Sequence, residues 1–317
     1  MGGWRKKSRY KREKYTLPSN VELDAKVDVG EAELFWYSPY EVVEGLDETF
    51  VEKIVEWIQN FKVNFETIGF DRTVEDLPKI KGSALVIDHP FTGTLDRHLQ
   101  ELKEYEGTVL VTDRALWKVL PYKVPDIVAN IDSSYLCISF FDRPDVKKHM
   151  KEINAVFAAT THPLTIRTWT SRTRYFFMPW LGSGYLTWNL AAMGGLPILY
   201  TGGEVSTLIW ILAVNLGAKH IGMLAIDNCF HSIEETEYPG VPHKIWEVNP
   251  WTGEKLPKKA YVDPVYKHYA EVHHALIKYA KEKHGVETYN CSPESGIMHA
   301  PWITDMPLKE FAEKFGR

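Results

Sequence analysis

The sequence predicts an α/β protein with a doubly wound, mostly parallel, Rossmann-like sheet that carries helices on both faces. Two observations support this fold class. Short apolar segments alternate with segments of helical length over residues 84–290, as in successive right-handed βαβ units. In addition, a Gly-Gly turn leads into a helix that is apolar on nearly every face and then into another apolar strand, so this helix must be buried.

The predicted elements follow from the spacing of apolar side chains. An amphipathic helix over residues 48–61 comes first, because its apolar residues recur at helical spacing. Apolar runs of strand length then predict strands at residues 84–88, 108–113, 126–132, 155–160, 174–178, 220–227 and 286–290. The segments between and after them predict helices at residues 94–105, 114–120, 146–153, 208–217, 267–284 and 308–315.

The Gly-Gly turn is the predicted centre of a nucleotide-binding βαβ unit. Gly202 and Gly203 let the backbone turn sharply, and Ser206 and Thr207 offer hydroxyl groups in the first helical turn. A helix that begins after such a turn presents free N–H groups and the positive end of its dipole, which suits a phosphate. The strand that follows ends at Asp227.

Length and charge predict the domain organisation. The chain has 317 residues and a net charge of −5, but residues 1–15 carry +6, so the remainder carries −11. We expect residues 1–45 to form a basic tail and irregular extension, and residues 46–317 to form one large Rossmann-like domain. The basic residues at 5–14 could contact RNA, an anionic surface or an acidic partner. A solubilising tail is the alternative.

Other features bear on compartment and assembly. The sequence lacks an apolar run near the roughly 18 residues of a membrane span and lacks a signal-peptide core, so a cytoplasmic location is expected. Cys137, Cys229 and Cys291 are far apart, which favours buried thiols over a disulfide framework or a zinc cluster. Residues 228–265 have little periodicity and predict a long loop or lid. An acidic single domain is compatible with a homo-oligomer.

Four predicted strands end in aspartate: Asp88, Asp113, Asp132 and Asp227. The carboxyl ends of parallel strands share one edge of the sheet, where ligands bind. Carboxylates gathered there repel one another unless a cation lies among them, and Mg²⁺ bridging phosphate oxygens is the predicted solution. Asp132 and Asp227 are the first choices as metal ligands, and Asp88 is the third. The alternative is that each aspartate caps the helix or turn that follows it.

Histidine and arginine residues near these strand ends are candidate catalytic groups. His89 follows the first strand, whereas His231 and His243 follow Asp227, and an imidazole titrates near neutral pH. Arg114 could clamp a diphosphate. Glu204 in the first turn of the apolar helix would repel a phosphate there, so either a metal mediates or the phosphate lies elsewhere. Ordinary solvated loop side chains are the alternative for each.

Five short motifs stand in a specific order and spacing: Asp113-Arg-Ala-Leu116, Pro125-Asp126 running into Ile131-Asp132, Gly202-Gly-Glu-Val205, Leu216-Gly-Ala-Lys219 and Ile226-Asp227. They resemble the domain shared by archaeal MptE-like 6-hydroxymethylpterin diphosphokinases and the motility accessory factor (Maf) glycosyltransferases. The segment Asn290-Cys-Ser-Pro-Glu-Ser-Gly296 resembles the closing segment of the glycosyltransferase branch. The resemblance covers most of the chain beyond the basic tail.

The resemblance implies a transferase that uses a phosphorylated nucleotide donor. In the kinase branch, ATP gives a diphosphate to the hydroxymethyl group of a reduced pterin, with Mg²⁺ holding the phosphates. In the glycosyltransferase branch, a nucleotide-activated acidic sugar goes to a hydroxyl group, in a fold similar to sialyltransferases. The expected donor is therefore ATP or a nucleotide-sugar, with a small-molecule acceptor in the first case. A non-catalytic member that acts as a binding module is the third alternative.

The resemblance also implies roles for individual residues. Asp113 and Arg114 would orient the donor, and His231 or His89 would take the acceptor proton. Where family members usually carry G-x-G-P-S-L, this chain reads Asp88-His-Pro-Phe-Thr-Gly-Thr-Leu95. The residues expected to bind the nucleotide and its phosphates are Gly93, Thr94, Asp113, Gly202, Gly203, Ser206 and Thr207.

Overall fold

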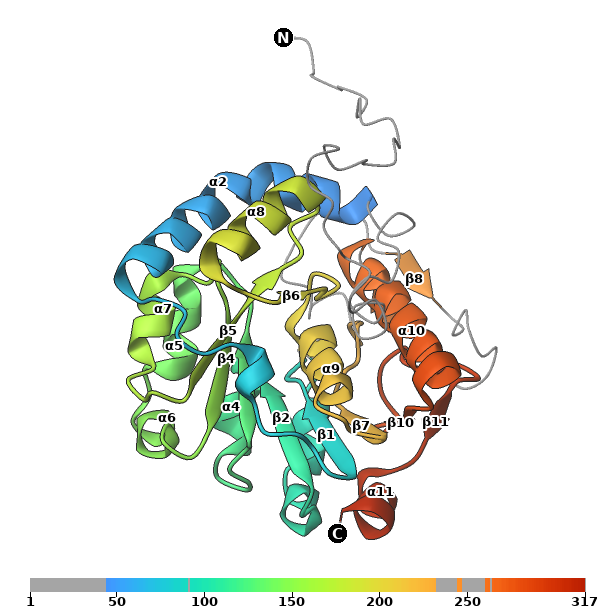
Figure 1. Ribbon diagram of the computed structural model, residues 1–317. Coiled ribbons are helices and arrows are strands. Elements are labelled where there is room, and N and C mark those ends of the chain that lie inside the picture. The colour runs from blue at the N-terminus through green and yellow to red at the C-terminus, as the bar shows by residue number, and fades with distance from the viewer. Residues whose placement is uncertain (1–43, 91, 232–243, 247–259, 263, 317) are drawn as a thin grey trace.

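The computed structural model describes residues 44–90, 92–231, 244–246, 260–262 and 264–316. In this part of the chain, nine strands form one sheet in the order β11-β10-β7-β1-β2-β3-β4-β5-β6 (Figure 1). Every neighbouring pair in the sheet is parallel. The predicted doubly wound, mostly parallel α/β class is therefore confirmed.

The strands lie close to the predicted segments. They are β1 Ser83–Ile87, β2 Thr108–Thr112, β3 Ile127–Asn130, β4 Asn154–Ala158, β5 Arg174–Pro179, β6 Ile198–Leu199, β7 His220–Leu224, β10 Glu287–Asn290 and β11 Ile303–Asp305. The edge strand β11 was not predicted, because only Ile303 of its three residues is buried and no apolar run marks it. A separate antiparallel pair, β8 Lys244–Trp246 and β9 Ala260–Val262, lies within the segment predicted as a loop or lid.

Each face of the sheet builds its own apolar core. Along β1, Val86 faces one core, whereas Leu85 and Ile87 face the other, and all three are fully buried. The other central strands alternate in the same way, because successive side chains of a strand point to opposite faces. Burial of both faces explains why the strands read as continuous apolar runs rather than as alternating ones.

The apolar helix after the Gly-Gly turn is α9, Val205–Asn215. It packs over β1, β2, β3 and β7 on one face of the sheet (Figure 1). Its residues from Ser206 to Val214 are all buried, as predicted from a segment that is apolar on every side. Since α9 joins β6 at the sheet edge to β7 beside β1, it carries the chain back across the middle of the sheet.

The remaining helices cover the two faces. They are α2 Glu44–Thr67, α3 Thr94–His98, α4 Asp113–Val119, α5 Ile138–Phe141, α6 Pro144–His149, α7 Pro163–Thr168, α8 Gly184–Gly194, α10 Pro264–His284 and α11 Leu308–Phe315, with 3₁₀ turns η2 Val74–Asp76, η3 Glu101–Glu104 and η4 Tyr135–Cys137. The single helix predicted over residues 94–105 is wrong, because α3 ends early and η3 follows, with Leu102 and Tyr105 fully buried. Helices α5 and α7 were too short to predict.

Helix α2 is fixed to the carboxyl edge of the sheet by two buried amides on one helix face. The Nδ2 groups of Asn60 and Asn64 donate at 2.8–3.2 Å to the carbonyl oxygens of Ser133, Ala159, Thr160 and Thr161. These carbonyls belong to the turns that follow β3 and β4. Helix α2 therefore forms part of the wall above the carboxyl edge of the sheet.

Several predictions concern residues outside the described ranges. The basic tail at 5–14 lies among them, as do His243 and most of the segment 228–265. All three cysteines are buried thiols, as expected. No helix in the described part of the chain is both long and apolar enough to cross a membrane.

Candidate functional site

The order in which the chain adds strands to the sheet reverses at β1, and this reversal locates the candidate site. From β1 the chain builds outward through β2 to β6, and α9 then returns it to β7 on the other side of β1. The connections that follow β1 and β7 therefore run in opposite directions along the sheet. In open α/β sheets, the crevice at such a reversal is where ligands bind.

The four predicted aspartates follow four adjacent strands, in the order Asp227 after β7, Asp88 after β1, Asp113 after β2 and Asp132 after β3. The prediction that they share one edge is thus correct. The pKa of Asp113 is raised to about 7, chiefly by burial and also by the charges of Asp132 and Asp88. Burial likewise raises the pKa of Asp88, with Asp227 adding to the effect. The row is therefore a continuous line of interacting carboxyl groups.

Asp227 is held by one of its two oxygens only. Within the described residues, Oδ2 accepts hydrogen bonds from the hydroxyls of Thr92, Thr94 at 2.6 Å and Ser295 at 3.0 Å. The other oxygen, Oδ1, is buried and has no hydrogen-bond partner in that part of the chain. Burial raises the pKa of Asp227, whereas the three hydroxyl donors and the nearby His231 lower it. A buried acceptor without a donor is expensive, so Oδ1 indicates a place for a ligand or cation.

The backbone around Asp227 is strained and closely packed. Ala225 has a φ angle of 57°, which L-residues other than Asn and Asp rarely adopt, whereas Asn228 tolerates its φ of 50°. Gly296 approaches from the loop after β10, and a Cβ at that position would lie 2.5 Å from Cα of Asp227. Because strain of this kind persists only where the surroundings impose it, the turn is built to hold Asp227 in place.

Asp88 and Asp113 accept their hydrogen bonds from adjacent backbone and from neighbouring strands. Oδ1 of Asp88 accepts from the N–H of His89 at 2.7 Å and from the hydroxyl of Thr112 at 2.8 Å. Asp113 accepts from its neighbour's N–H, that of Arg114, at 2.7 Å and from the Asn130 amide. The positive charge of Arg114 lowers the pKa of Asp88, so this cation lies near the strand-end row.

The structure places the predicted metal ligands Asp132 and Asp227 at different points of the sheet edge. Asp132 is exposed, and its Oδ1 accepts the N–H of Ser134 at 2.8 Å, which is the capping role of the alternative interpretation. Strands β3 and β7 are separated by β2 and β1, so strand spacing places Asp132 about 14 Å from Asp227. One ion cannot bind both. Among the described residues, no group of three or more His, Cys, Asp or Glu side chains is arranged to hold a metal.

Asp88 and Asp227 remain as a pair that fits Mg²⁺. This ion usually binds through one or two carboxylates, keeps several waters and takes further oxygens from substrate phosphates. The buried, unpartnered Oδ1 of Asp227 supplies an acceptor of the right kind, and Asp88 follows the adjacent strand. A three-carboxylate cage is not required for this mode of binding.

The start of α9 lies at the same edge as the aspartate row. Gly202 and Gly203 have φ angles of 63° and 89°, as predicted for the sharp turn. The pKa of Glu204 is raised to about 7, chiefly by burial and also by the charge of Asp88, against the lowering effect of the nearby hydroxyls of Ser206 and Thr207. Glu204 is thus partly protonated at neutral pH, which weakens the repulsion of a phosphate that the sequence predicted.

A histidine that sequence reasoning missed lies beside Glu204. Nδ1 of His273, on α10, is 3.8 Å from Oε1 of Glu204, and His273 is completely buried. Burial lowers the pKa of His273 to about 3, so the imidazole is neutral and the contact is not an ion pair. His273 was not predicted because a histidine on an amphipathic helix carries no local signal of its position.

The two described candidate histidines have different surroundings. Nε2 of His231 lies 3.3 Å from Oγ of Ser295, which joins this histidine to Asp227 through one hydroxyl. The ring centroid of His89 lies 6.3 Å from that of Trp117. The pKa of His89 is lowered to about 4, chiefly by burial and also by the charges of Lys118 and Arg114. His231 therefore lies within the Asp227 cluster, and His89 lies on the Arg114 side.

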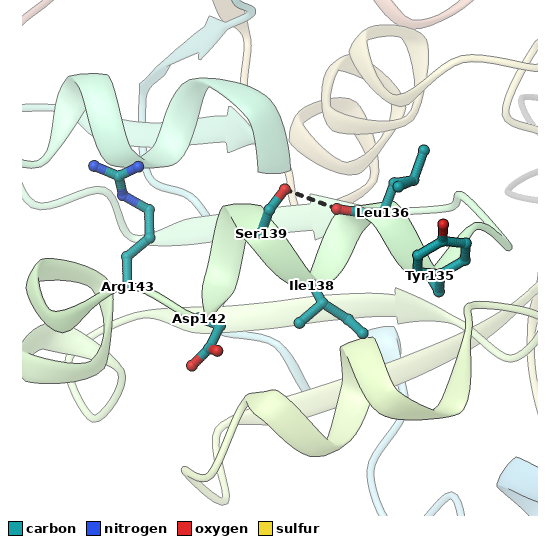
Figure 2. A pocket seen from close by; sticks show the side chains of 6 residues that line it. All are labelled: Tyr135, Leu136, Ile138, Ser139, Asp142 and Arg143. Atoms are coloured by element: carbon teal, nitrogen blue, oxygen red, sulfur yellow. Dashed lines mark hydrogen bonds between the residues drawn. The ribbon is translucent and has the colours of Figure 1, made fainter.

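An open hollow of about 620 Å³ lies beside this edge, over η4 and α5 (Figure 2). Its lining side chains are Tyr135, Leu136, Ile138, Ser139, Asp142 and Arg143. Figure 2 shows Ser139 and Arg143 on one side of the helix and Ile138 and Asp142 on the other, so these groups do not converge on a common point. None of the predicted site residues lines the hollow, and the chemistry is concentrated at the strand ends instead.

Two hydroxyl residues complete the cluster and were not among the predicted site residues. Thr92 adjoins Gly93, whose φ of 69° turns the chain so that Thr92 and Thr94 both reach Asp227. Ser295 belongs to the closing motif noted in the sequence, but no role followed from it. The structure therefore brings together Thr94, Asp227 and His231 as predicted, and adds these two hydroxyls.

Residues 93–232 match the MptE-like family model, described as 6-hydroxymethylpterin diphosphokinase MptE-like. The predicted family resemblance is confirmed. The MptE-like segment contains Thr94, Asp113, the α9 turn, Asp227 and His231, whereas Asp88 and Ser295 lie on either side of it. No curated protein sequence matches the chain at a significant level.

Among solved structures, the fold resembles that of the MAf glycosyltransferase from Magnetospirillum magneticum AMB-1. The TM-score is 0.54 at 11% sequence identity, and the match covers 74% of this chain. It covers 35% of the glycosyltransferase, so the chain spans about a third of that protein's length. At this identity the likeness describes the fold alone.

Proposed function

We propose that this protein is a transferase that acts on a phosphorylated nucleotide donor, and that its reaction is ATP-dependent diphosphate transfer to the hydroxymethyl group of a pterin. The match of residues 93–232 to the MptE-like family supports the reaction class. The position of the acidic row at the sheet reversal supports a nucleotide site there.

One observation carries the proposal: Oδ1 of Asp227 is buried and has no partner among the described residues, although Oδ2 accepts three hydroxyl donors. A structural aspartate would have both oxygens satisfied or exposed to water. A single satisfied oxygen leaves the other available to a bound group. Since Asp88 follows the next strand, the pair can receive a cation that carries the donor phosphates.

The other groups at the edge take roles that suit phosphoryl-type transfer. Mg²⁺ on Asp88 and Asp227 would neutralise the donor phosphates. Arg114 supplies a fixed positive charge beside Asp88, and the turn at Gly202 and Gly203 presents the N–H groups at the start of α9. In reactions of this kind, positioning and charge neutralisation account for most of the catalysis.

In the proposed transfer the acceptor oxygen would form a bond to the β-phosphorus of ATP, the bond from that phosphorus to the α–β bridging oxygen would break, and AMP would leave. The acceptor hydroxyl must also lose its proton. His231 is the better placed of the two candidate bases, because its Nε2 lies 3.3 Å from Oγ of Ser295, within the cluster around Asp227. His89 is further along the edge, and its pKa of about 4 makes it a weak base at neutral pH. We therefore assign proton acceptance to His231.

A nucleotide-sugar glycosyltransferase is the second candidate. The fold likeness to the MAf glycosyltransferase supports it, as does the position of the closing motif at residues 290–296, whose Ser295 contacts Asp227. In this case the acceptor hydroxyl would attack the anomeric carbon of the sugar, and the nucleotide would leave with its phosphate. The same aspartate row and α9 turn would hold that nucleotide.

Thermal unfolding with ATP, CTP and CMP, each with and without Mg²⁺, tests the proposal, because a ligand that binds the native state alone raises the melting temperature. A rise with ATP that requires Mg²⁺ supports the diphosphokinase. A metal-independent rise with CMP or CTP supports the glycosyltransferase. If no nucleotide changes the melting temperature, the proposal of a transferase is wrong, and a non-catalytic binding module becomes the better interpretation.

A further inference from the structure

Ser295 lies at the centre of the cluster, although it is outside the segment that matches the family. It is 1% exposed, and its Oγ contacts the carboxylate of Asp227, the imidazole of His231 and the hydroxyl of Thr94. A hydroxyl has one proton to donate and two lone pairs that accept. Ser295 can therefore donate to Asp227 while its lone pairs remain open to a proton on Nε2 of His231; the proton of Thr94 goes to Asp227.

The hydroxyl donors fix the rotation of the Asp227 carboxylate. Thr92 and Thr94 come from the start of α3, and Ser295 comes from the loop after β10, so Oδ2 is held from two separate elements. A carboxylate held by one hydroxyl could rotate about its terminal bond, since such torsions are broad. With Oδ2 held from both sides, Oδ1 has a single direction.

The loop that carries Ser295 is itself held against Asp227. The N–H of Ile297 donates to the carbonyl oxygen of Asp227 at 2.9 Å, and Gly296 lies directly on the Asp227 backbone. On the outside, Glu294 contacts Nε2 of His98 at 2.7 Å. These contacts tie the loop to the turn of Asp227 and to α3, so Ser295 has little room to move.

We propose that Ser295 is a positioning residue for Asp227, which holds Oδ2 so that Oδ1 is presented to the Mg²⁺-bound nucleotide. This inference rests on the proposed function and extends it to the closing segment of the chain. Groups that orient a metal ligand in this way change metal affinity by about 10- to 100-fold when they are removed. Ser295 acts through Asp227 and does not itself touch the reacting atoms.

The test compares two serine variants of the same loop. Ser295→Ala removes the donor to Asp227, whereas Ser292→Ala removes the acceptor of the Ala225 N–H, which lies at 3.0 Å and does not touch Asp227. Both serines are 1% exposed, so both variants remove a buried hydroxyl, but only the Ser295 hydroxyl contacts Asp227. We expect Ser295→Ala to weaken Mg²⁺-dependent ATP binding about 10- to 100-fold by calorimetric titration, and Ser292→Ala to bind like the wild type.

Thr94 provides a second pair of variants should Ser295→Ala fail to fold. Thr94→Val keeps the side-chain shape and removes the hydroxyl, whereas Thr94→Ser keeps the hydroxyl. The positioning role predicts weak ATP binding in the first and recovery in the second. A double variant, Ser295→Ala with Asp227→Asn, should bind no more weakly than Asp227→Asn alone, because Ser295 acts through Asp227.

The outcomes separate this inference from the proposed function. Equal ATP affinity in the wild type and in Ser295→Ala overturns the positioning role and leaves the transferase standing. Nucleotide binding by the wild type that needs no metal also overturns the positioning role and leaves the transferase standing. A wild type that binds none of the three nucleotides overturns both proposals. Equal losses in Ser295→Ala and Ser292→Ala would assign the effect to loop structure and also contradict the inference.

Discussion

The hydroxyl of Ser295 donates to Oδ2 of Asp227 at 3.0 Å, across a separation of 68 residues. Three segments meet at this contact: the turn after β1, the turn after β7 and the loop after β10. Only the first two flank or enter the segment that matches the MptE-like family. The site is therefore a property of the whole sheet edge, and its acidic row is kept in place by hydroxyl groups from distant parts of the chain.

Substitution of Asp227 should show whether its carboxylate binds a ligand or only caps the backbone. We expect Asp227→Asn to lose the Mg²⁺-dependent rise in melting temperature with ATP, because the amide keeps the shape but removes the charge that a cation needs. Asp132→Asn is the matched control, since Asp132 follows another strand at the same sheet edge but is exposed and accepts the N–H of Ser134. A loss of the ATP effect in Asp132→Asn alone would contradict the assignment.

The pH dependence of stability should show the buried carboxyl group of Glu204. Its pKa is raised to about 7 in the folded protein, from an ordinary value of 4.5. The native state therefore binds more protons than the unfolded state between these values, and stability falls as pH rises through the window. Glu204→Gln cannot ionise, so it should lose less stability than the wild type between pH 5 and pH 8, by about 2–3 kcal/mol.

Urea unfolding at several pH values measures this difference. Asp113, whose pKa is also raised to about 7, remains in both proteins and cancels in the comparison. Parallel curves of unfolding free energy against pH for the wild type and Glu204→Gln would show that Glu204 is ionised normally in the folded state.

The sequence allowed the sheet and its acidic edge to be predicted, because both leave local signals. The apolar runs mark β1 and β7, and Asp88 and Asp227 follow them directly. The partners of these aspartates could not be predicted in the same way. Ser295 and His273 reach the site from distant elements, and no pattern within either element indicates the contact. The separation of Asp132 from Asp227 could not be predicted either. It depends on the order of the strands in the sheet, which periodicity does not reveal.

The attachment of α2 to the sheet edge can be tested with Asn64→Ala. Asn64 is fully buried, and its Nδ2 donates to the carbonyls of Ala159 at 2.9 Å and Thr161 at 2.8 Å. Removal of the amide leaves both carbonyls without this donor, so we expect a loss of about 2–4 kcal/mol in the free energy of unfolding. Lys62→Ala changes an exposed side chain of the same helix and should cost less than about 0.5 kcal/mol. Similar losses in the two variants would show that the amide contacts contribute little.

Gly296 offers the most direct test of how closely the closing loop packs on Asp227. A Cβ at this position would lie 2.5 Å from Cα and 2.8 Å from the carbonyl oxygen of Asp227, in addition to the strain of an alanine at a φ of 77°. Gly285 has a φ of 63° and open space around the position of its Cβ, so Gly285→Ala measures the strain alone. We expect Gly285→Ala to cost about 1–2 kcal/mol in unfolding free energy. Gly296→Ala should cost several kcal/mol more and also abolish nucleotide binding, because the backbone that carries Asp227 must shift. If the two alanine variants lose the same stability and bind nucleotide equally, then the loop does not press on Asp227, and the position of Oδ1 must be set by the hydroxyl groups without it.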